Sequence, residues 1–340
     1  MSATYFPSDE IVSRYRSRRT ALAYVRLARP FTLVAPAMGM ASGGVVAYFA
    51  EGDKFAASGW DFLKVLLLGT LAGALLNAAS NALNQIFDLD IDRINKPDRV
   101  LCKGDISILG AGVFTGITGT LALMLAGVIS TLTGHWGTLA LFVAAALFSV
   151  FYSAPPFRMK SRAWWANLTV AVPRGTLLKV AGWSLAQSIL SWEAWYIGLI
   201  MGIFLLGATT TKDFADARGD AAYGVKTLPV LYGARKAAKL VAPFLVLPFL
   251  LLPLAVGIGM TTGFHLLTGH PVDMTILGVI CALWGAHIAA RILSDPESLT
   301  NTENHPAWRH MYYLMIFIQI GFVLAYVPYG FYGQILSELT

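Results

Sequence analysis

Residues 62–92 read FLKVLLLGTLAGALLNAASNALNQIFDLDID, a long apolar run that ends in three aspartates set two residues apart. About 20 consecutive apolar residues form a helix that can cross the hydrocarbon core of a membrane, which is about 30 Å thick. Residues 62–86 therefore predict a membrane-spanning helix. The aspartates that follow predict a charged cluster where this helix leaves the membrane.

The composition of the whole chain agrees with a membrane protein. Of its 340 residues, 56% are hydrophobic and 13% are charged, whereas soluble domains carry about 25% charged residues. A soluble monomer of this size could not bury so much apolar surface. The two cysteines, Cys102 and Cys281, are too few for a disulfide framework. A soluble enzyme, a disordered chain and a secreted disulfide scaffold are all disfavoured.

Nine apolar runs are long enough to be considered as membrane spans, and the fifth is the weakest because charged residues and a proline interrupt it. They cover residues 31–50, 62–86, 106–131, 136–153, 165–186, 193–211, 239–263, 272–292 and 311–332. We therefore expect an all-α, polytopic membrane protein of about nine helices, with residues 31–340 as one membrane domain. Residues 1–30 lack the apolar core of a signal peptide. Their arginines, interleaved with apolar residues, are typical of an amphipathic helix on an anionic membrane surface.

The basic residues predict the orientation of the chain. Of 25 lysines and arginines, 21 lie in the N-terminal segment or in the loops after spans two, four, six and eight. The positive-inside rule assigns that side to the cytoplasm, so we expect a cytoplasmic N-terminus, cytoplasmic active-site loops and an external C-terminus. The net charge of +6 does not indicate nucleic-acid binding, because these residues are spread over short loops and not over one soluble face.

Two aspartate clusters follow spans two and six. If the second span continues as a helix, Asn84, Asp88 and Asp92 share one face, and Asn77 and Asn81 extend that stripe into the membrane. Buried amides of this kind are expected to face a cavity or the helix bundle.

The second cluster places Asp213, Asp216 and Asp220 on one helical face. So many carboxylates on one side of the membrane repel one another unless cations offset their charge. Mg²⁺ prefers oxygen ligands and commonly binds a few carboxylates together with substrate phosphates. We therefore predict a diphosphate substrate held between the clusters by Mg²⁺, with the metal ligands Asn84, Asp88, Asp92, Asp213, Asp216 and Asp220.

Nearby basic side chains are candidates for binding the diphosphate oxygens. They are Arg93, Arg99, Arg158, Lys160, Lys212 and Lys226. The simpler alternative is that acidic and basic residues at helix ends only solvate the membrane interface. For a single residue the two interpretations are about equally strong, but two clusters with matched helical spacing favour a site.

The chain resembles the UbiA superfamily of intramembrane prenyltransferases over nearly its whole length. The resemblance rests on the two aspartate clusters and the segments after them, Arg93-Ile94-Asn95-Lys96-Pro97 and Gly224-Val225-Lys226-Thr227-Leu228-Pro229. Arg29-Pro30 before the first span and the stretch from Tyr152 to Lys160 also match. Gln85 after Asn84, Thr211-Lys212-Asp213 and Val172-Pro173-Arg174-Gly175 are most similar to the homogentisate prenyltransferase-like branch. The segment Asp98-Arg99-Val100-Leu101 departs from that branch, and Arg218 stands where the family commonly has Glu.

This resemblance implies a helical bundle around a central cavity that opens laterally to lipid. It implies transfer of a prenyl chain from a polyprenyl diphosphate to a lipophilic acceptor, with Asp88, Asp92, Asp213 and Asp220 as the catalytic carboxylates. Tyr152 joins the candidate substrate-binding residues. An aromatic, quinone-precursor-like acceptor is favoured. The alternatives are an oxygen nucleophile, such as a chlorophyllide carboxylate or a glycerol-phosphate lipid, and, outside the enzymes, a cation-coupled transporter.

Arg174 and Lys179 lie in the fifth predicted span, where a charge is costly unless it is paired or hydrated. Arg174 is expected about 14 Å deep, at about 1.5 Å per residue from the start of the span. Our hypothesis is that it meets an anionic or phenolic part of the acceptor, and a purely structural partnership has equal weight. Lys179 points about 140° away around the helix, so we expect it outside that site. The motifs leave the acceptor, the prenyl length and the oligomeric state open.

Overall fold

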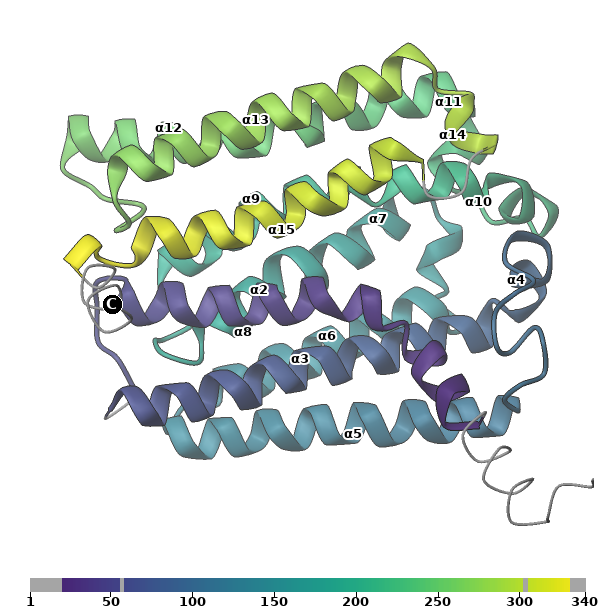
Figure 1. Ribbon diagram of the computed structural model, residues 1–340, viewed down its shortest axis with the longest axis horizontal. Helices are drawn as coiled ribbons and strands as arrows, with labels where there is room; N and C mark the ends of the chain where they lie inside the picture. Colours follow the sequence, from purple (N-terminus) through teal and green to yellow (C-terminus); the bar gives the residue numbers. More distant parts are fainter. Residues whose placement is uncertain (1–19, 56–57, 302–304, 331–340) are drawn as a thin grey trace, which may run out of the picture.

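The computed structural model describes residues 20–55, 58–301 and 305–330. Within these residues the chain is helical and contains no strand; one isolated backbone bridge joins Arg162 to Lys226. The long helices lie side by side in a bundle (Figure 1). The predicted all-α class is therefore confirmed.

The long helices are α2 (Pro30–Phe49), α3 (Gly59–Phe87), α5 (Ile108–Thr133), α6 (Gly137–Ser153), α9 (Trp192–Ala208), α12 (Leu247–Thr262), α13 (Pro271–Ser294) and α15 (Pro306–Tyr326). One further crossing is built from three pieces, α7 (Trp164–Ala171), the π-helical turn η2 (Val172–Leu177) and α8 (Leu178–Trp183). The shorter elements are α4 (Leu89–Asn95), η1 (Met159–Ser161), α10 (Thr210–Ala222), α11 (Leu228–Val241), η3 (Ala242–Leu245) and α14 (Ser298–Asn301).

Six helical stretches of the described chain are long and apolar enough to cross a membrane. They contain α2, α3, α5, α9 with α10, α11 with α12, and α13. The chain is an integral membrane protein. The shorter α6, the composite α7–η2–α8 and α15 lie alongside these helices (Figure 1), and the count of nine spans stays a prediction.

The predicted seventh span, residues 239–263, falls in the apolar stretch Leu228–Thr262, with Gly263 just beyond it, but this stretch is not one continuous helix. Helix α11 ends at Val241, the 3₁₀ turn η3 follows, and α12 begins only at Leu247. Pro243 and Pro248 lie at the starts of η3 and α12. Proline lacks the amide hydrogen that a continuous helix needs, so the chain changes helix here.

Several helix ends follow directly from local sequence. The hydroxyl of Ser58 accepts a hydrogen bond from the Asp61 amide at 3.2 Å, and Ser107 caps α5 through the Gly110 amide at 3.0 Å. Serine is a preferred residue at this position because its oxygen satisfies an amide that has no partner within the helix. Helices α2, α13 and α15 begin with proline, which suits the first helical position.

The outward faces of the bundle are apolar. Leu109, Met124 and Leu283 are 77%, 60% and 67% exposed. Contiguous exposed apolar surface is rare in soluble monomers and marks a surface that another apolar phase covers. In this bundle that phase is lipid.

The segment that precedes α2 is helical over residues 20–28. Its Ala23 and Leu27 are buried in a small core with Leu101 and Ile106 of the loop after α4. The expected amphipathic helix therefore packs against protein on one side in this part, while Leu22 and Val25 remain exposed. Residues 1–19, with Arg14, Arg16, Arg18 and Arg19, lie outside the described residues.

Candidate active site

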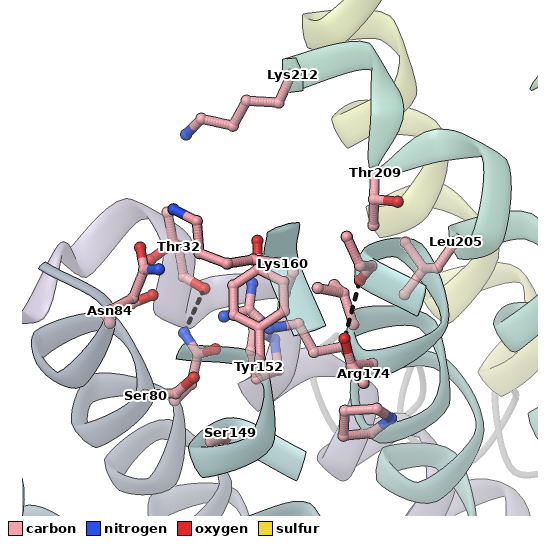
Figure 2. Close-up of a pocket in the computed structure, with 18 of the residues that line it drawn as sticks. Thr32, Ser80, Asn84, Ser149, Tyr152, Lys160, Arg174, Leu205, Thr209 and Lys212 are labelled. Carbon is pink, nitrogen blue, oxygen red and sulfur yellow. Dashed lines mark hydrogen bonds between the residues drawn. The ribbon is translucent and has the colours of Figure 1, made fainter. Parts of the chain in front are cut away.

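A cavity of about 320 Å³ opens at the end of the bundle where α3 and α10 terminate. Its walls come from α2, α3, α4, α6, the α7–α8 crossing, α9, α10 and α15. Figure 2 shows Tyr152 and Lys160 near the centre of this region, with Asn84 and Lys212 on opposite sides. We call this end of the bundle the charged end, because both aspartate clusters lie there.

The first aspartate cluster lies at a break between two helices. Helix α3 ends at Phe87, and Asp88 has φ −103° and ψ 8° before α4 starts at Leu89. The condition of a continuous helix to Asp92, on which the shared face was argued, is therefore not met, although the Asp92 amide still donates to the Asp88 carbonyl at 2.7 Å. The predicted face is nevertheless retained. Its members Asn77, Asn81, Asn84, Asp88 and Asp92 all line the cavity.

The second cluster lies on α10, which continues almost directly from α9. Asp213, Asp216 and Asp220 all line the cavity, as their helical spacing predicts. From the described residues, no hydrogen bond or ion pair reaches the carboxylates of Asp213 and Asp220. These two side chains are therefore available to bind a ligand.

One asparagine joins the two clusters. Asn95 of α4 donates through Nδ2 to the Asp216 carbonyl at 3.0 Å, and its Oδ1 accepts from the Gly219 amide at 3.0 Å. A Cβ atom at position 219 would lie 2.4 Å from the Asn95 oxygen, so only glycine permits this approach. We call this contact the Asn95 clamp. It holds α4 against α10, and thus the first cluster against the second.

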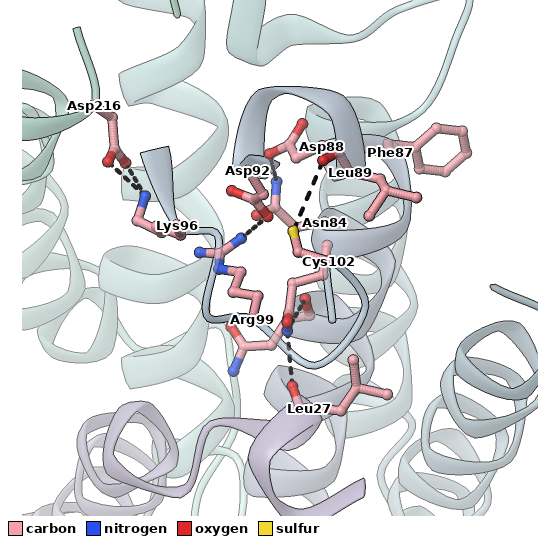
Figure 3. A network of polar contacts seen from close by, with 12 residues as sticks. Leu27, Asn84, Phe87, Asp88, Leu89, Asp92, Lys96, Arg99, Cys102 and Asp216 are labelled. Atoms are coloured by element: carbon pink, nitrogen blue, oxygen red, sulfur yellow. Dashed lines mark hydrogen bonds and ion pairs between the residues drawn. The ribbon is translucent and has the colours of Figure 1, made fainter. Parts of the chain in front are cut away.

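Basic side chains offset several of the carboxylates (Figure 3). Lys160 lies 2.5 Å from Asp88. Asp88 also accepts a hydrogen bond from Asn84 Nδ2 at 2.7 Å. Arg99 forms an ion pair with Asp92, and Lys96 lies 2.5 Å from Asp216. Each of these contacts supplies a partner for a carboxylate that would otherwise be an uncompensated charge when no ligand is bound.

Burial changes the pKa of two groups at this end. Burial raises the pKa of Asp92 above its ordinary value, although Arg99 and Lys96 act in the opposite direction. Burial and the charges of Arg99 and Arg174 lower the pKa of Arg29 to about 10. With a pKa of about 10, Arg29 stays charged at neutral pH. Arg29 also has a left-handed backbone, with φ 59° and ψ 67°, directly before α2.

Arg174 and Tyr152 lie deeper, beneath the carboxylates. Arg174 belongs to the π-helical turn η2, and its side chain projects into the cavity. Among the described residues, no carboxylate forms an ion pair with its guanidinium. Tyr152 lies beside Lys160 and Arg174 in Figure 2. The hypothesis that Arg174 faces the cavity is consistent with this geometry, and its role remains a proposal.

Three of the predicted site residues do not line the cavity. Arg93 is exposed and pairs with Asp90 at 2.9 Å, on the outer side of α4. Lys226 is also exposed, and only its backbone contacts the Arg162–Ala163 segment. Arg158 lies at the margin, with Nη2 3.9 Å from an Asp88 oxygen and 3.3 Å from the Phe87 carbonyl. The other predicted residues all line the cavity: Asn84, Asp88, Asp92, Arg99, Tyr152, Lys160, Arg174, Lys212, Asp213, Asp216 and Asp220.

The sequence analysis missed Arg29, Lys96 and Asn95 as cavity residues. Arg29 and Lys96 lay within the quoted family motifs, so those motifs were a usable signal. Asn95 lies in the same quoted motif as Lys96, but its role in joining the clusters carried no local signal, because its partners in α10 are more than 120 residues away in the chain.

The oxygen ligands at the charged end fit Mg²⁺ if substrate oxygens complete the coordination of the ion. Carboxylates and an asparagine oxygen are hard ligands, and one buried oxygen of Asp88 has no hydrogen-bond partner among the described residues. No group of three acidic, histidine or cysteine side chains in the described chain lies close enough to hold a metal ion by itself. Substrate oxygens would have to complete the coordination, as is usual for Mg²⁺ bound with phosphates.

Comparison with known sequences identifies a family and several similar proteins. A profile described as the UbiA prenyltransferase family matches residues 45–293. The bacteriochlorophyll synthase 34 kDa chain of Chloroflexus aurantiacus is 32% identical over 281 residues, which are 81% of this chain and 81% of that protein. A digeranylgeranylglyceryl phosphate synthase of Methanobrevibacter smithii is 30% identical over 51% of this chain and 60% of the relative. The homogentisate phytyltransferase of a Synechocystis species is 26% identical over 63% of this chain and 69% of that protein.

Solved structures share the fold. A UbiA homolog from Archaeoglobus fulgidus bound to GPP and Mg²⁺ superposes with a TM-score of 0.67 at 20% identity, covering 90% of this chain and 100% of that chain. A structure of digeranylgeranylglyceryl phosphate synthase superposes with a TM-score of 0.64 at 23% identity, covering 90% of this chain and 98% of that chain.

Proposed function

Because this chain belongs to the UbiA prenyltransferase family and is a membrane prenyltransferase, we propose that it transfers a prenyl chain from a polyprenyl diphosphate to an aromatic, quinone-precursor-like acceptor, with Mg²⁺ as cofactor. The observation that carries this proposal is the convergence of both aspartate clusters on one cavity. The A. fulgidus homolog bound to GPP and Mg²⁺ has the same fold, which supports the choice of donor and metal.

In the proposed complex, the diphosphate lies between α4 and α10. Asp88, Asp92, Asp213, Asp216 and Asp220, with Asn84, would hold Mg²⁺ against its oxygens. Arg99, Lys160, Lys212 and the additional Arg29 and Lys96 would bind the remaining oxygens, as guanidinium and ammonium groups bind phosphate. Bound Mg²⁺ would neutralise negative charge on the leaving group. The exposed Arg93 and Lys226 are omitted from this assignment.

The reaction breaks the bond between the first prenyl carbon and the diphosphate oxygen, and the electron pair leaves with diphosphate. The basic side chains stabilise the charge that develops there. The cavity beneath, lined by Leu76, Leu141, Phe142 and Leu205, excludes water from the allylic cation, which would otherwise capture water and give an alcohol. The acceptor then forms the new bond and loses a proton.

Arg174 supports an acceptor with an anionic or phenolic oxygen. A guanidinium without a carboxylate partner in the described chain, projecting into an apolar cavity, favours a ligand that carries such an oxygen. Tyr152 lies beside it and could contact the same group.

A second candidate acceptor is an oxygen nucleophile. The relatives that support it are the bacteriochlorophyll synthase chain and the digeranylgeranylglyceryl phosphate synthases, whose names indicate products other than a prenylated ring. Transfer to a carboxylate would give an ester, which alkaline hydrolysis cleaves. Transfer to a hydroxyl would give an ether and transfer to a ring carbon a carbon–carbon bond; both resist hydrolysis and are told apart by the mass of the acceptor that they carry.

We also propose that the charged end faces the cytoplasm. Twenty-one of the 25 lysines and arginines lie in the segments that the positive-inside rule assigns to that side. The membrane domain would comprise residues 31–340.

The test is an assay of the purified full-length protein with Mg²⁺, farnesyl or geranylgeranyl diphosphate, and an acceptor panel of homogentisate, chlorophyllide and a glycerol-phosphate lipid. Mass spectrometry before and after alkaline hydrolysis distinguishes a ring-carbon product from an ester. We expect Mg²⁺-dependent release of diphosphate with a homogentisate-type product. The acceptor KM should rise about 10- to 100-fold in Arg174→Met, since a charged hydrogen bond is lost.

Loss of thermal stability in Arg174→Met with an unchanged acceptor KM would assign Arg174 a structural role. A product formed only with chlorophyllide or the glycerol-phosphate lipid would favour the second candidate. Failure to release diphosphate with any acceptor would contradict the proposed function.

A further inference from the structure

Two buried side-chain amides of α3 hold the short helix over residues 20–28. Asn81 Nδ2 donates to the Ala28 carbonyl at 3.0 Å, and Gln85 Nε2 donates to the Leu27 carbonyl at 2.9 Å (Figure 3). Asn81 and Gln85 are 4% and 2% exposed, and because they are four residues apart they share one face of α3. We call these two side chains the amide pair.

The two carbonyls need these donors because the short helix stops at Arg29. The last carbonyls of a helix have no amide partner within it, and a buried carbonyl without a partner is unfavourable. Leu27 is fully buried, so water cannot take the place of the Gln85 amide. The amide pair therefore completes the end of this helix.

The same contacts reach the backbone of Arg29. Its carbonyl accepts a hydrogen bond from Thr32 Oγ1 at 2.9 Å, and that oxygen accepts from Asn81 Nδ2 at 2.8 Å. An asparagine amide has two hydrogens, so Asn81 can bond Thr32 and the Ala28 carbonyl together. The left-handed conformation of Arg29 is uncommon for a residue with a side chain and persists only where its surroundings fix it. The amide pair and Thr32 are those surroundings.

Arg29 is the basic residue that this turn presents to the cavity. Its side chain lines the cavity, and within residues 20–55, 58–301 and 305–330 no carboxylate forms an ion pair with it. A guanidinium binds phosphate oxygens through donors in a fixed planar arrangement, so the direction of the group matters. Because the side chain is long, a small rotation of the backbone at Arg29 moves the guanidinium much further.

We propose that Gln85 and Asn81 are positioning residues for Arg29. They fix the left-handed turn at Arg29 and thereby hold its guanidinium where it binds the donor diphosphate. This inference rests on the proposed function, in which Arg29 binds diphosphate oxygens. Gln85 does not line the cavity, so its effect on the substrate passes through Arg29, and it is the better of the two residues to test.

The first measurement uses Gln85→Met, which keeps the approximate length of the side chain and removes the amide donor. The Leu27 carbonyl then has no partner, and the turn at Arg29 should be held less accurately. We expect the inhibition constant of inorganic pyrophosphate against Mg²⁺-dependent prenyl transfer to rise about tenfold, the effect of one weakened charged hydrogen bond. The donor KM should rise with it, and neither constant depends on the amount of folded protein.

Gln187→Met is the matched control. Gln187 is 5% exposed, and its Nε2 donates to the carbonyls of Ala47 and Ala50 at the other end of α2, at 2.7 and 3.2 Å. It completes a helix end as Gln85 does, but it does not line the cavity and lies far from Arg29 along α2. Both variants should lower the thermal unfolding midpoint, and only Gln85→Met should change the inhibition constant. Equal rises in both would overturn the proposal.

The second measurement asks whether Gln85 acts through Arg29. Arg29→Gln should by itself raise the inhibition constant of pyrophosphate at least about tenfold, because a charged donor is lost. Adding Gln85→Met to Arg29→Gln should raise it by less than about twofold more, since residues that act through one contact are not additive. The same rise from Gln85→Met in both backgrounds, or no rise in Arg29→Gln, would also overturn the proposal.

Thr32→Val gives the same test if Gln85→Met does not fold. This substitution keeps the shape of the side chain and removes the hydroxyl that joins Asn81 to the Arg29 carbonyl. The inhibition constant should rise about threefold or more. An unchanged constant in the folded Thr32→Val protein would count against the positioning role in the same way.

An unchanged inhibition constant in folded Gln85→Met, with normal turnover by the wild type, would refute the positioning role and leave the proposed function intact. Absence of turnover with every donor in the wild type would instead refute the proposed function and the positioning role with it.

Discussion

The two aspartate segments present their carboxylates differently. In the first segment, Asp88 and Asp92 each contact a basic side chain, Lys160 and Arg99. In α10 only Asp216 has such a partner, whereas Asp213 and Asp220 have none among the described residues. The carboxylates of Asp88 and Asp92 are thus already paired with basic side chains, whereas α10 carries two carboxylates that have no such partner and are available to a ligand. This difference predicts which substitutions affect catalysis and which affect stability.

The largest effect is expected for Asp213→Asn. Removing this carboxylate should lower kcat/KM by about 10²- to 10³-fold, because it would remove charge that holds the metal and the leaving group. Since no side chain of the described chain pairs with the Asp213 carboxyl group, the substitution breaks no ion pair, and the thermal unfolding midpoint should be at least as high as that of the wild type. Diphosphate release and thermal unfolding in the same detergent measure both quantities.

Asp90→Asn is the matched control for this prediction. Asp90 lies in the same charged end, but it is exposed and pairs with Arg93. Its activity should stay within about twofold of the wild type. An Asp213→Asn protein as active as Asp90→Asn would remove the distinction between the two aspartate segments.

An intermediate effect is expected for Asn95→Leu, which breaks the Asn95 clamp. The two clusters should then be held less accurately relative to each other. Activity should fall about tenfold or more, because small misplacements of reacting groups lower the reaction rate by such factors. Because the clusters would share the metal less well, the Mg²⁺ concentration for half-maximal activity should rise. A titration of activity against Mg²⁺ measures this change.

Asn301→Leu serves as the comparison, since Asn301 is exposed and, within the part of the chain that the structure describes, its side chain bonds the Glu297 carbonyl alone, at 3.3 Å. Its Mg²⁺ titration should match the wild type. The same titration curve for Asn95→Leu would mean that the clamp does not set the spacing of the clusters.

The smallest effects are expected for Arg93→Ala and Lys226→Ala. Both side chains are exposed and point away from the cavity, and exposed ion pairs contribute only about 0–1 kcal/mol. Each variant should retain activity within about twofold, with an unchanged KM for the donor. A tenfold rise in that KM for either one would indicate that the loop moves over the cavity when substrate binds.

Helical spacing predicted the two aspartate faces correctly, because residues three or four apart share one face wherever the chain is locally helical. It did not predict the break at Asp88, nor the start of α12, where Pro243 and Pro248 interrupt the helix. Arg93 and Lys226 show a second limit. Their position next to an aspartate cluster made them candidates, but the direction of a side chain beyond a helix end is set by contacts far along the chain.

The sequence by itself determined that this protein is a helical membrane protein with two acidic clusters and a prenyltransferase's motifs, because hydrophobicity and helical periodicity are local properties. The tertiary structure alone decided that Asn95 joins the clusters and that Arg29 and Lys96 enter the cavity. Each of these contacts pairs groups from distant parts of the chain, and burial makes such pairing necessary, since a polar group removed from water must find its partner wherever the fold brings one.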